Sequence, residues 1–171
     1  LFTLKSTNGK MLFVRIARKG VPEAGSETAA SSNINMTVSY SYLSGQPIDV
    51  SDIPQGTDFI ATVTLTNTSG YKSLDNVALS QIFPSGWEII NSRLFTVELG
   101  QDSYYTYQDI RDDRVLTYMN MYNNSVYTYR VMLNATYEGK YYLPAVVCET
   151  MYDDSNYART KGMWVTVSKF Q

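Results

Sequence analysis

The chain has 171 residues, of which 44% are hydrophobic and 18% charged, with a formal net charge of −2. This size and composition are typical of one globular domain with its own core, and the charge gives no basic surface for nucleic acid or an anionic membrane. The sequence has no histidine and one cysteine, which excludes an internal disulfide and removes the usual general base and the commonest metal ligand.

Residues 1–19 predict a β-hairpin. Apolar residues lie on both sides of Asn8-Gly9, a pair typical of tight hairpin turns. Because a lone hairpin is marginally stable in water, we expect it to pack on the main domain or to be the tail of a preceding domain. The chain begins with Leu1 rather than Met, which favours a fragment of a longer protein.

Residues 20–33 are small and polar, with almost no apolar periodicity. This composition is typical of a linker, and we expect it to be mobile or extended on the surface. The remaining residues, 34–171, form the predicted main domain.

Alternation of apolar and polar residues dominates that main domain, as expected of strands with one buried face. The alternating sets fall within residues 36–42, 59–65, 127–137 and 163–167. Turn-forming Gly, Pro and Asn residues separate them, and no segment shows a helical period. The pattern predicts an all-β fold, an antiparallel immunoglobulin-like β-sandwich of about seven to nine strands with residues 127–137 in a central strand.

Charges gather in one segment, Asp109-Ile-Arg-Asp-Asp-Arg114. A calcium site would need six to eight oxygen ligands, whereas two arginines interrupt these acids. We therefore predict structural ion pairs and no metal site, with Arg111 and Arg114 binding carboxylates. The candidate partners are Asp109, Asp112 and Asp153.

Cys148 lies between Val147 and Glu149 in an alternating segment. A nucleophilic thiol needs a nearby base, and the chain has no histidine to serve as one. A thioester of the Cys-x-Glu-Gln type is excluded as well, because Met151 stands where Gln is required. We predict a small buried thiol, and no catalytic residue in the chain.

The segment Met151-Tyr-Asp-Asp-Ser-Asn-Tyr157 leaves a strand with large apolar residues on a polar loop. Such a mixture is found in plain strand connections and also in recognition loops, where Met, Tyr and adaptable polar residues are favoured. The residues alone leave both interpretations open.

Several segments together resemble the C-terminal domain of bacterial alpha-2-macroglobulins, which are large protease traps. They include Tyr107-Gln-Asp-Ile-Arg-Asp-Asp-Arg-Val115, Tyr142-Leu-Pro-Ala145 and Glu149-Thr-Met-Tyr-Asp153. The most specific parts are Asp109-Ile-Arg-Asp-Asp-Arg114 and Met151-Tyr-Asp153, in that order and spacing. The resemblance covers about residues 33–167 and implies a macroglobulin-type β-sandwich. It also implies that the hairpin is the tail of the domain into which the thioester domain is inserted.

The resemblance implies that the chain is the C-terminal domain of a broad-spectrum protease inhibitor. Met151, Tyr152 and Asp153 become candidates for a contact that shields the thioester domain. The expected partners are that domain, neighbouring macroglobulin-like domains and, indirectly, target proteases; no cofactor, nucleic acid or membrane insertion is expected. The parent protein is expected in the bacterial periplasm or at the cell surface, anchored to the membrane by a segment outside this chain.

Two other classes stay open at this point. One is an immunoglobulin-like adhesion or carbohydrate-binding module, which would need exposed aromatic residues on a sheet face. The other is a structural spacer in a multidomain surface protein, in which the Met151–Tyr152 loop would be dispensable.

Overall fold

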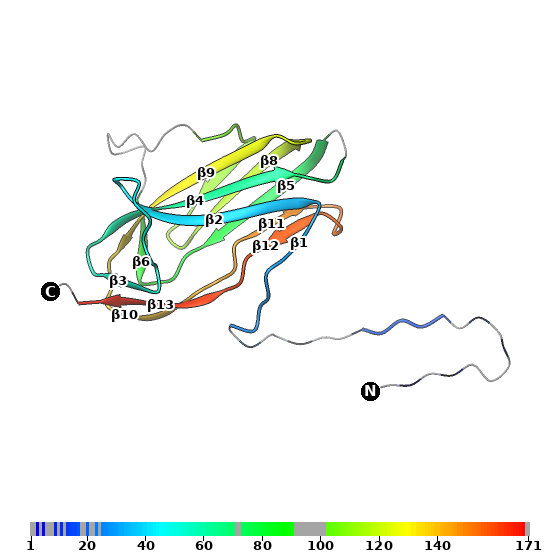
Figure 1. The fold of residues 1–171 in the computed structure, drawn as a ribbon, viewed down its shortest axis with the longest axis horizontal. Coiled ribbons are helices and arrows are strands. Elements are labelled where there is room, and N and C mark those ends of the chain that lie inside the picture. The colour runs from blue at the N-terminus through cyan, green and yellow to red at the C-terminus, as the bar shows by residue number, and fades with distance from the viewer. Residues whose placement is uncertain are drawn as a thin grey trace.

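The computed structural model describes residues 25–70, 73–90 and 102–169, together with residues 3, 5, 9, 11, 13–17, 20 and 23. Within these residues the regular structure is entirely β, with thirteen strands in three sheets and no helix (Figure 1). The predicted all-β sandwich is therefore confirmed. In the part of the chain described, no helix is long and apolar enough to cross a membrane.

One layer is an antiparallel four-stranded sheet with the order β2-β4-β9-β6. Its strands are β2 (Ile34–Tyr42), β4 (Asp58–Asn67), β9 (Val126–Ala135) and β6 (Trp87–Ile90). Phe59, Ala61, Val63 and Leu65 are all buried, so β4 alternates strictly as the sequence predicted. β9 lies inside the sheet, paired with β4 and β6, although it ends at Ala135, two residues earlier than expected.

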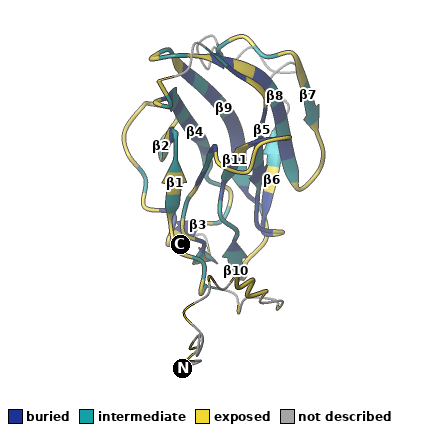
Figure 2. Ribbon diagram, turned by 90° about the vertical axis from the view of Figure 1, so that its right-hand side faces the viewer, coloured by how far each residue is buried: buried dark blue, intermediate teal, exposed yellow. Residues whose placement is uncertain are grey.

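The facing layer is a six-stranded antiparallel sheet with the order β1-β12-β11-β5-β8-β7. Its strands are β1 (Ala30–Ser32), β12 (Tyr157–Arg159), β11 (Val147–Thr150), β5 (Ser73–Ile82), β8 (Arg114–Tyr122) and β7 (Tyr107–Ile110). Figure 2 shows the two layers from the side, with β2, β4 and β9 opposite β5, β8 and β7. Two buried apolar clusters fill the space between them.

A third, small sheet closes one end of the molecule. It contains β10 (Gly139–Leu143), β13 (Met163–Ser168) and β3 (Asp52–Pro54). β13 runs antiparallel to β10 but parallel to β3, the one parallel strand pair among the described residues. Trp87 plugs the adjacent corner, buried edge-on against Phe59 with the ring centroids 4.9 Å apart.

The strand count exceeds the predicted seven to nine because several strands are too short to show alternation. β1, β3 and β12 have three residues each, and β6, β7 and β11 have four. A segment of three or four residues shows at most two residues on each face, too few for a period-two signal. Such strands are recognised only from the neighbours with which they pair.

The predicted linker, residues 20–33, needs one correction. Ala30–Ser32 form β1, which pairs with β12 over Arg159, Ala158 and Tyr157. Alanine and serine carry little strand signal, so the composition concealed this pairing. The predicted hairpin at residues 1–19 lies largely outside the described residues, and the described residues 13–17 form no strand.

Candidate functional site: the loop between β11 and β12

The loop of residues 151–156 joins two neighbouring strands of the six-stranded sheet. It presents two large side chains to solvent: Met151 is 54% exposed and Tyr152 83% exposed. We call these two residues the tip. Met and Tyr are enriched at protein–protein interfaces, which makes the tip the candidate contact surface of this loop.

Asp153 holds the turn that follows the tip. Its Oδ1 accepts hydrogen bonds from the backbone amide of Ser155 at 3.0 Å and from the Ser155 hydroxyl at 2.6 Å. Its Oδ2 accepts one from the side-chain amide of Asn156 at 2.7 Å. These bonds, the Ser155 hydroxyl first among them, hold the pKa of the Asp153 carboxyl below its usual range, because they favour the charged form.

Asn156 is the buried anchor of the loop, only 3% exposed. Its carbonyl accepts a hydrogen bond from the Thr150 amide at 3.1 Å, which closes the loop at its base. The Thr150 hydroxyl also donates a short bond to the carbonyl of Asp153. The tip is therefore carried on a loop with a fixed base.

A bulge in β5 supports the loop from the side. The pairing of β5 with β8 shifts between Leu74 and Val77, so Asp75 and Asn76 stand opposite the single residue Asn120. Asn76 has a positive φ of 55°, its amide donates to Asn120 Oδ1 at 2.9 Å, and its carbonyl accepts from the Met151 amide at 3.0 Å. The bulge thus places the backbone of the tip.

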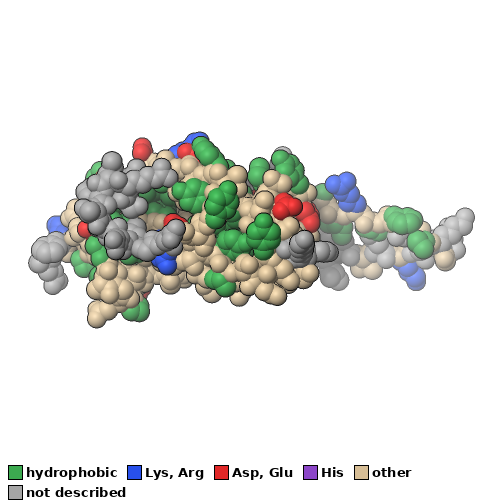
Figure 3. All heavy atoms as spheres, turned by 90° about the horizontal axis from the view of Figure 1, so that it is seen from above, with side chains coloured by type: hydrophobic (Ala, Val, Ile, Leu, Met, Phe, Trp, Pro, Cys, Tyr) green, Lys and Arg blue, Asp and Glu red, His purple; other side chains and the backbone are tan. Residues whose placement is uncertain are grey.

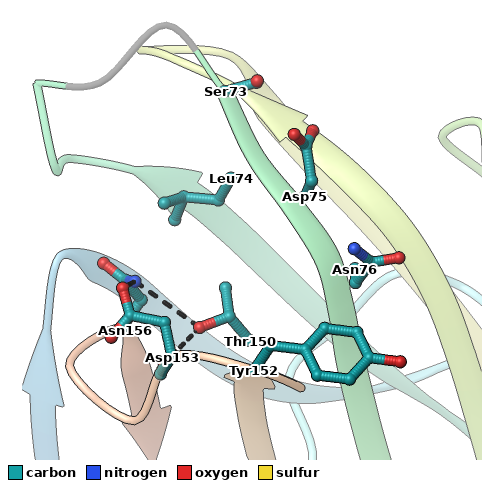
Figure 4. A pocket seen from close by; sticks show the side chains of 8 residues that line it. All are labelled: Ser73, Leu74, Asp75, Asn76, Thr150, Tyr152, Asp153 and Asn156. Carbon is teal, nitrogen blue, oxygen red and sulfur yellow. Dashed lines mark hydrogen bonds between the residues drawn. The ribbon is translucent and has the colours of Figure 1, made fainter.

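Bulge and loop together enclose a shallow open pocket of about 360 Å³. In Figure 4, Asp75 and Asn76 lie on one side of it, and Thr150, Asp153 and Asn156 on the other. The Tyr152 ring extends from the loop towards the strand that carries Asn76. On the loop side of this pocket, the side-chain amide of Asn156 donates hydrogen bonds to Asp153 and Thr150.

The sequence analysis proposed Met151, Tyr152 and Asp153 together as contact residues, and the structure gives them different roles. Met151 and Tyr152 are exposed, whereas the Asp153 carboxylate is occupied by Ser155 and Asn156 of its own loop. Asp153 is thus a structural residue of the turn, and the prediction that it pairs with an arginine is wrong.

The charged segment forms two local ion pairs on the surface. Arg111 contacts Asp109 at 2.8 Å, and Arg114 contacts Asp113 at 2.6 Å. Arg114 therefore pairs with its sequence neighbour rather than with Asp112, which is exposed. The Arg114 hydrogen bonds lower the pKa of Asp113, since they stabilise the carboxylate.

The remaining candidates for chemistry are structural. Cys148 is a free thiol, fully buried against both sheets, and burial raises its pKa to about 12. Such a thiol is almost wholly protonated at neutral pH and is no nucleophile. Within the described residues, no three His, Cys, Asp or Glu side chains lie close enough to hold a metal ion.

The sequence reasoning missed a group of tyrosines on the outer face of the six-stranded sheet. Tyr107 stacks on Tyr118 of the neighbouring strand with centroids 6.0 Å apart, and Tyr122 lies further along the same face. Tyr107 and Tyr122 are about 60% and 61% exposed. Seen from above, hydrophobic side chains, a class that includes tyrosine in this view, gather near the middle of the molecule (Figure 3).

A family model described as the bacterial alpha-2-macroglobulin MG10 domain matches residues 34–155. No curated protein sequence matches significantly. Among solved structures, the chain is similar to native alpha-2-macroglobulin from Escherichia coli, spanning MG7 to the C-terminus (TM-score 0.74, 16% identity). It is also similar to Salmonella alpha-2-macroglobulin reacted with methylamine (TM-score 0.73, 20% identity).

These alignments cover 86% and 87% of this chain, but 25% of the Escherichia coli chain and 10% of the Salmonella chain. The chain therefore spans a small part of the proteins that it resembles. At such low identity the likeness shows the fold alone.

Proposed function

The chain belongs to the family of bacterial alpha-2-macroglobulin MG10 domains, and we propose that it serves as the C-terminal domain of an alpha-2-macroglobulin-like broad-spectrum protease inhibitor. In this role it packs against the thioester domain of its parent and shields the thioester through Met151 and Tyr152. The observation that carries the proposal is the exposure of these two side chains on a loop with a fixed base.

A thioester survives in water only if water and small amines are kept from its acyl carbon. Met and Tyr supply apolar cover, and exclusion of water from a reactive bond is a recognised task of such side chains. Because Asp153 and Asn156 already order the loop, little conformational entropy remains to be lost when the tip docks.

The test is the reactivity of the parent protein towards methylamine before any protease is added. In a parent with a thioester, Met151→Ala and Tyr152→Ala should each speed the loss of the thioester several-fold, because the cover is thinned. Tyr104→Ala is the matched control: this side chain is 81% exposed, like Tyr152, but lies outside the loop. Unchanged amine reactivity in both tip variants would refute the shielding role.

We propose further that the domain acts without catalysis of its own and that target proteases meet it only through the full-length inhibitor. Its direct partners are the thioester domain and the neighbouring macroglobulin-like domains. The parent protein is proposed to work in the bacterial periplasm or at the cell surface.

A second candidate is an immunoglobulin-like adhesion or carbohydrate-binding module. The exposed tyrosines on the outer face of the six-stranded sheet favour it, since such a module needs aromatic residues on a sheet face. Titration with oligosaccharides separates the two: sugar-induced shifts confined to the resonances of Tyr107 and Tyr122 would favour the module.

A further inference from the structure

Asn33 lies where the chain crosses from one layer of the sandwich to the other. The residues before it, Ala30–Ser32, pair with β12 in the six-stranded sheet, and those after it, Ile34–Tyr42, pair with β4 in the four-stranded sheet. Asn33 makes the crossing with a positive φ of 62°, a conformation that asparagine tolerates better than most residues.

The side chain of Asn33 reaches the loop that carries the tip. Its Nδ2 donates to Oδ1 of Asn156 at 3.0 Å and to the carbonyl of Ser155 at 3.5 Å, 123 and 122 residues away in the sequence. Asn156 is buried, so its amide has little access to water as an alternative partner. Each of its side-chain polar atoms thus has a protein partner, Asn33 on one side and Asp153 on the other.

The segment before Asn33 is itself fastened to the sandwich. Arg159 Nε of β12 donates to the carbonyl of Thr28 at 3.0 Å. The Tyr142 hydroxyl donates a short bond to Glu27 and accepts one from the amide of Gly25 at 3.0 Å. The docked segment, residues 25–33, therefore contacts Tyr142 of β10 at its start and pairs with β12 at its end. β12 is the strand that begins directly after the tip loop.

We propose that Asn33 is a positioning residue that holds the tip through Asn156 and couples the docking of residues 25–33 to the order of the tip loop. For its functional consequence the inference rests on the proposed shielding role. A pull on the chain N-terminal to residue 25, such as a rearrangement of a preceding domain, first breaks the contacts of Gly25, Glu27 and Thr28 and then acts on β1. Detachment of β1 withdraws Asn33 from Asn156, loosens the loop and weakens the cover over the thioester.

The test uses Asn33→Gly in the full chain, because glycine keeps the positive φ and removes only the side-chain amide. Amide hydrogen exchange at Thr150, Ser155 and Asn156 should become at least about fivefold faster, the factor that corresponds to the loss of one ordinary hydrogen bond. The matched control is Asn124→Gly, a residue with a φ of 58° in the turn between β8 and β9. It should leave these three rates unchanged.

The amide hydrogen exchange rate within β9, for example at Val131, separates a local loosening of the loop from a destabilisation of the whole fold. This rate should not change in either variant. Equal rates at Thr150, Ser155 and Asn156 in Asn33→Gly and the unmodified chain would overturn the inference. Acceleration that also extends through β9 to the same degree would overturn it too, because it would mark Asn33 as a general stabiliser of the fold.

A second readout distinguishes this inference from the proposed function. In a parent with a thioester, Asn33→Gly should speed the reaction with methylamine, as Met151→Ala and Tyr152→Ala do. If the tip variants accelerate the reaction and Asn33→Gly does not, the coupling is wrong and the shielding role stands. If none accelerates it, the shielding role fails, and the exchange rates still decide whether Asn33 positions the loop.

Discussion

At the scale of single residues, asparagine carries much of the geometry around the candidate site. Asn33, Asn76 and Asn124 all have positive φ, and two of them contact the tip loop directly. Asparagine suits these places because its short amide tolerates the left-handed region and bonds to nearby backbone. The alternation of apolar and polar residues gives no information about the role of a single asparagine. The sequence analysis therefore did not identify Asn33, Asn76 and Asn156.

The charged segment of residues 109–114 yields a prediction about stability. The Arg111 side chain is 64% exposed and that of Asp109 27%, while Arg114 and Asp113 are 40% and 51% exposed. Arg111→Ala and Arg114→Ala should therefore each cost only about 0–1 kcal/mol in the free energy of unfolding, measured in urea.

Leu133→Ala provides the comparison for that experiment. Leu133 is fully buried in the core, so its truncation should cost about 2–5 kcal/mol. A loss of the same size for either arginine would show that the cluster supports the fold in a way that its exposure does not suggest.

At the scale of elements, the long strands were predictable and the short ones were not. Residues 59–65 and 127–135 alternate over enough positions for the period to be read, and both form strands with one buried face. β1 and the bulge in β5 depend on partners far away in the sequence, and no local pattern encodes them. The exposure of the tip was predictable from the polar residues around it. The hydrogen bonds that hold its loop to Asn33 and Asn76 were not predictable, because they depend on β1 and on the bulge in β5.

The bulge gives an element-scale prediction. Asn76 has a positive φ, and no side-chain hydrogen bond of Asn76 is seen among the described residues. Asn76→Gly should leave stability nearly unchanged, whereas Asn76→Ala should cost about 1–2 kcal/mol, because alanine adopts the left-handed region less readily than asparagine or glycine does. Thermal unfolding of both variants checks this, and equal stabilities would show that the backbone of the bulge adapts without strain.

At the scale of the whole molecule, large side chains are exposed at two places of functional interest among the described residues. One is the tip, on the loop between β11 and β12. The other is the outer face of the six-stranded sheet, which carries Tyr107 and Tyr122. The domain aligns with a quarter or less of the alpha-2-macroglobulin chains that it resembles. We propose that the tip is the surface that contacts the thioester domain, because its two large side chains are exposed on a loop held by hydrogen bonds.

The most direct test of that assignment is photo-crosslinking from residue 152 in the full-length parent. A photoreactive phenylalanine analogue in place of Tyr152 preserves an aromatic ring at an exposed position. If the tip covers the thioester, mass spectrometry should find crosslinks to the thioester-bearing domain before protease treatment and few after it. Crosslinks only to other domains, or no crosslink at all, in the untreated protein would contradict the proposed contact between the tip and the thioester domain.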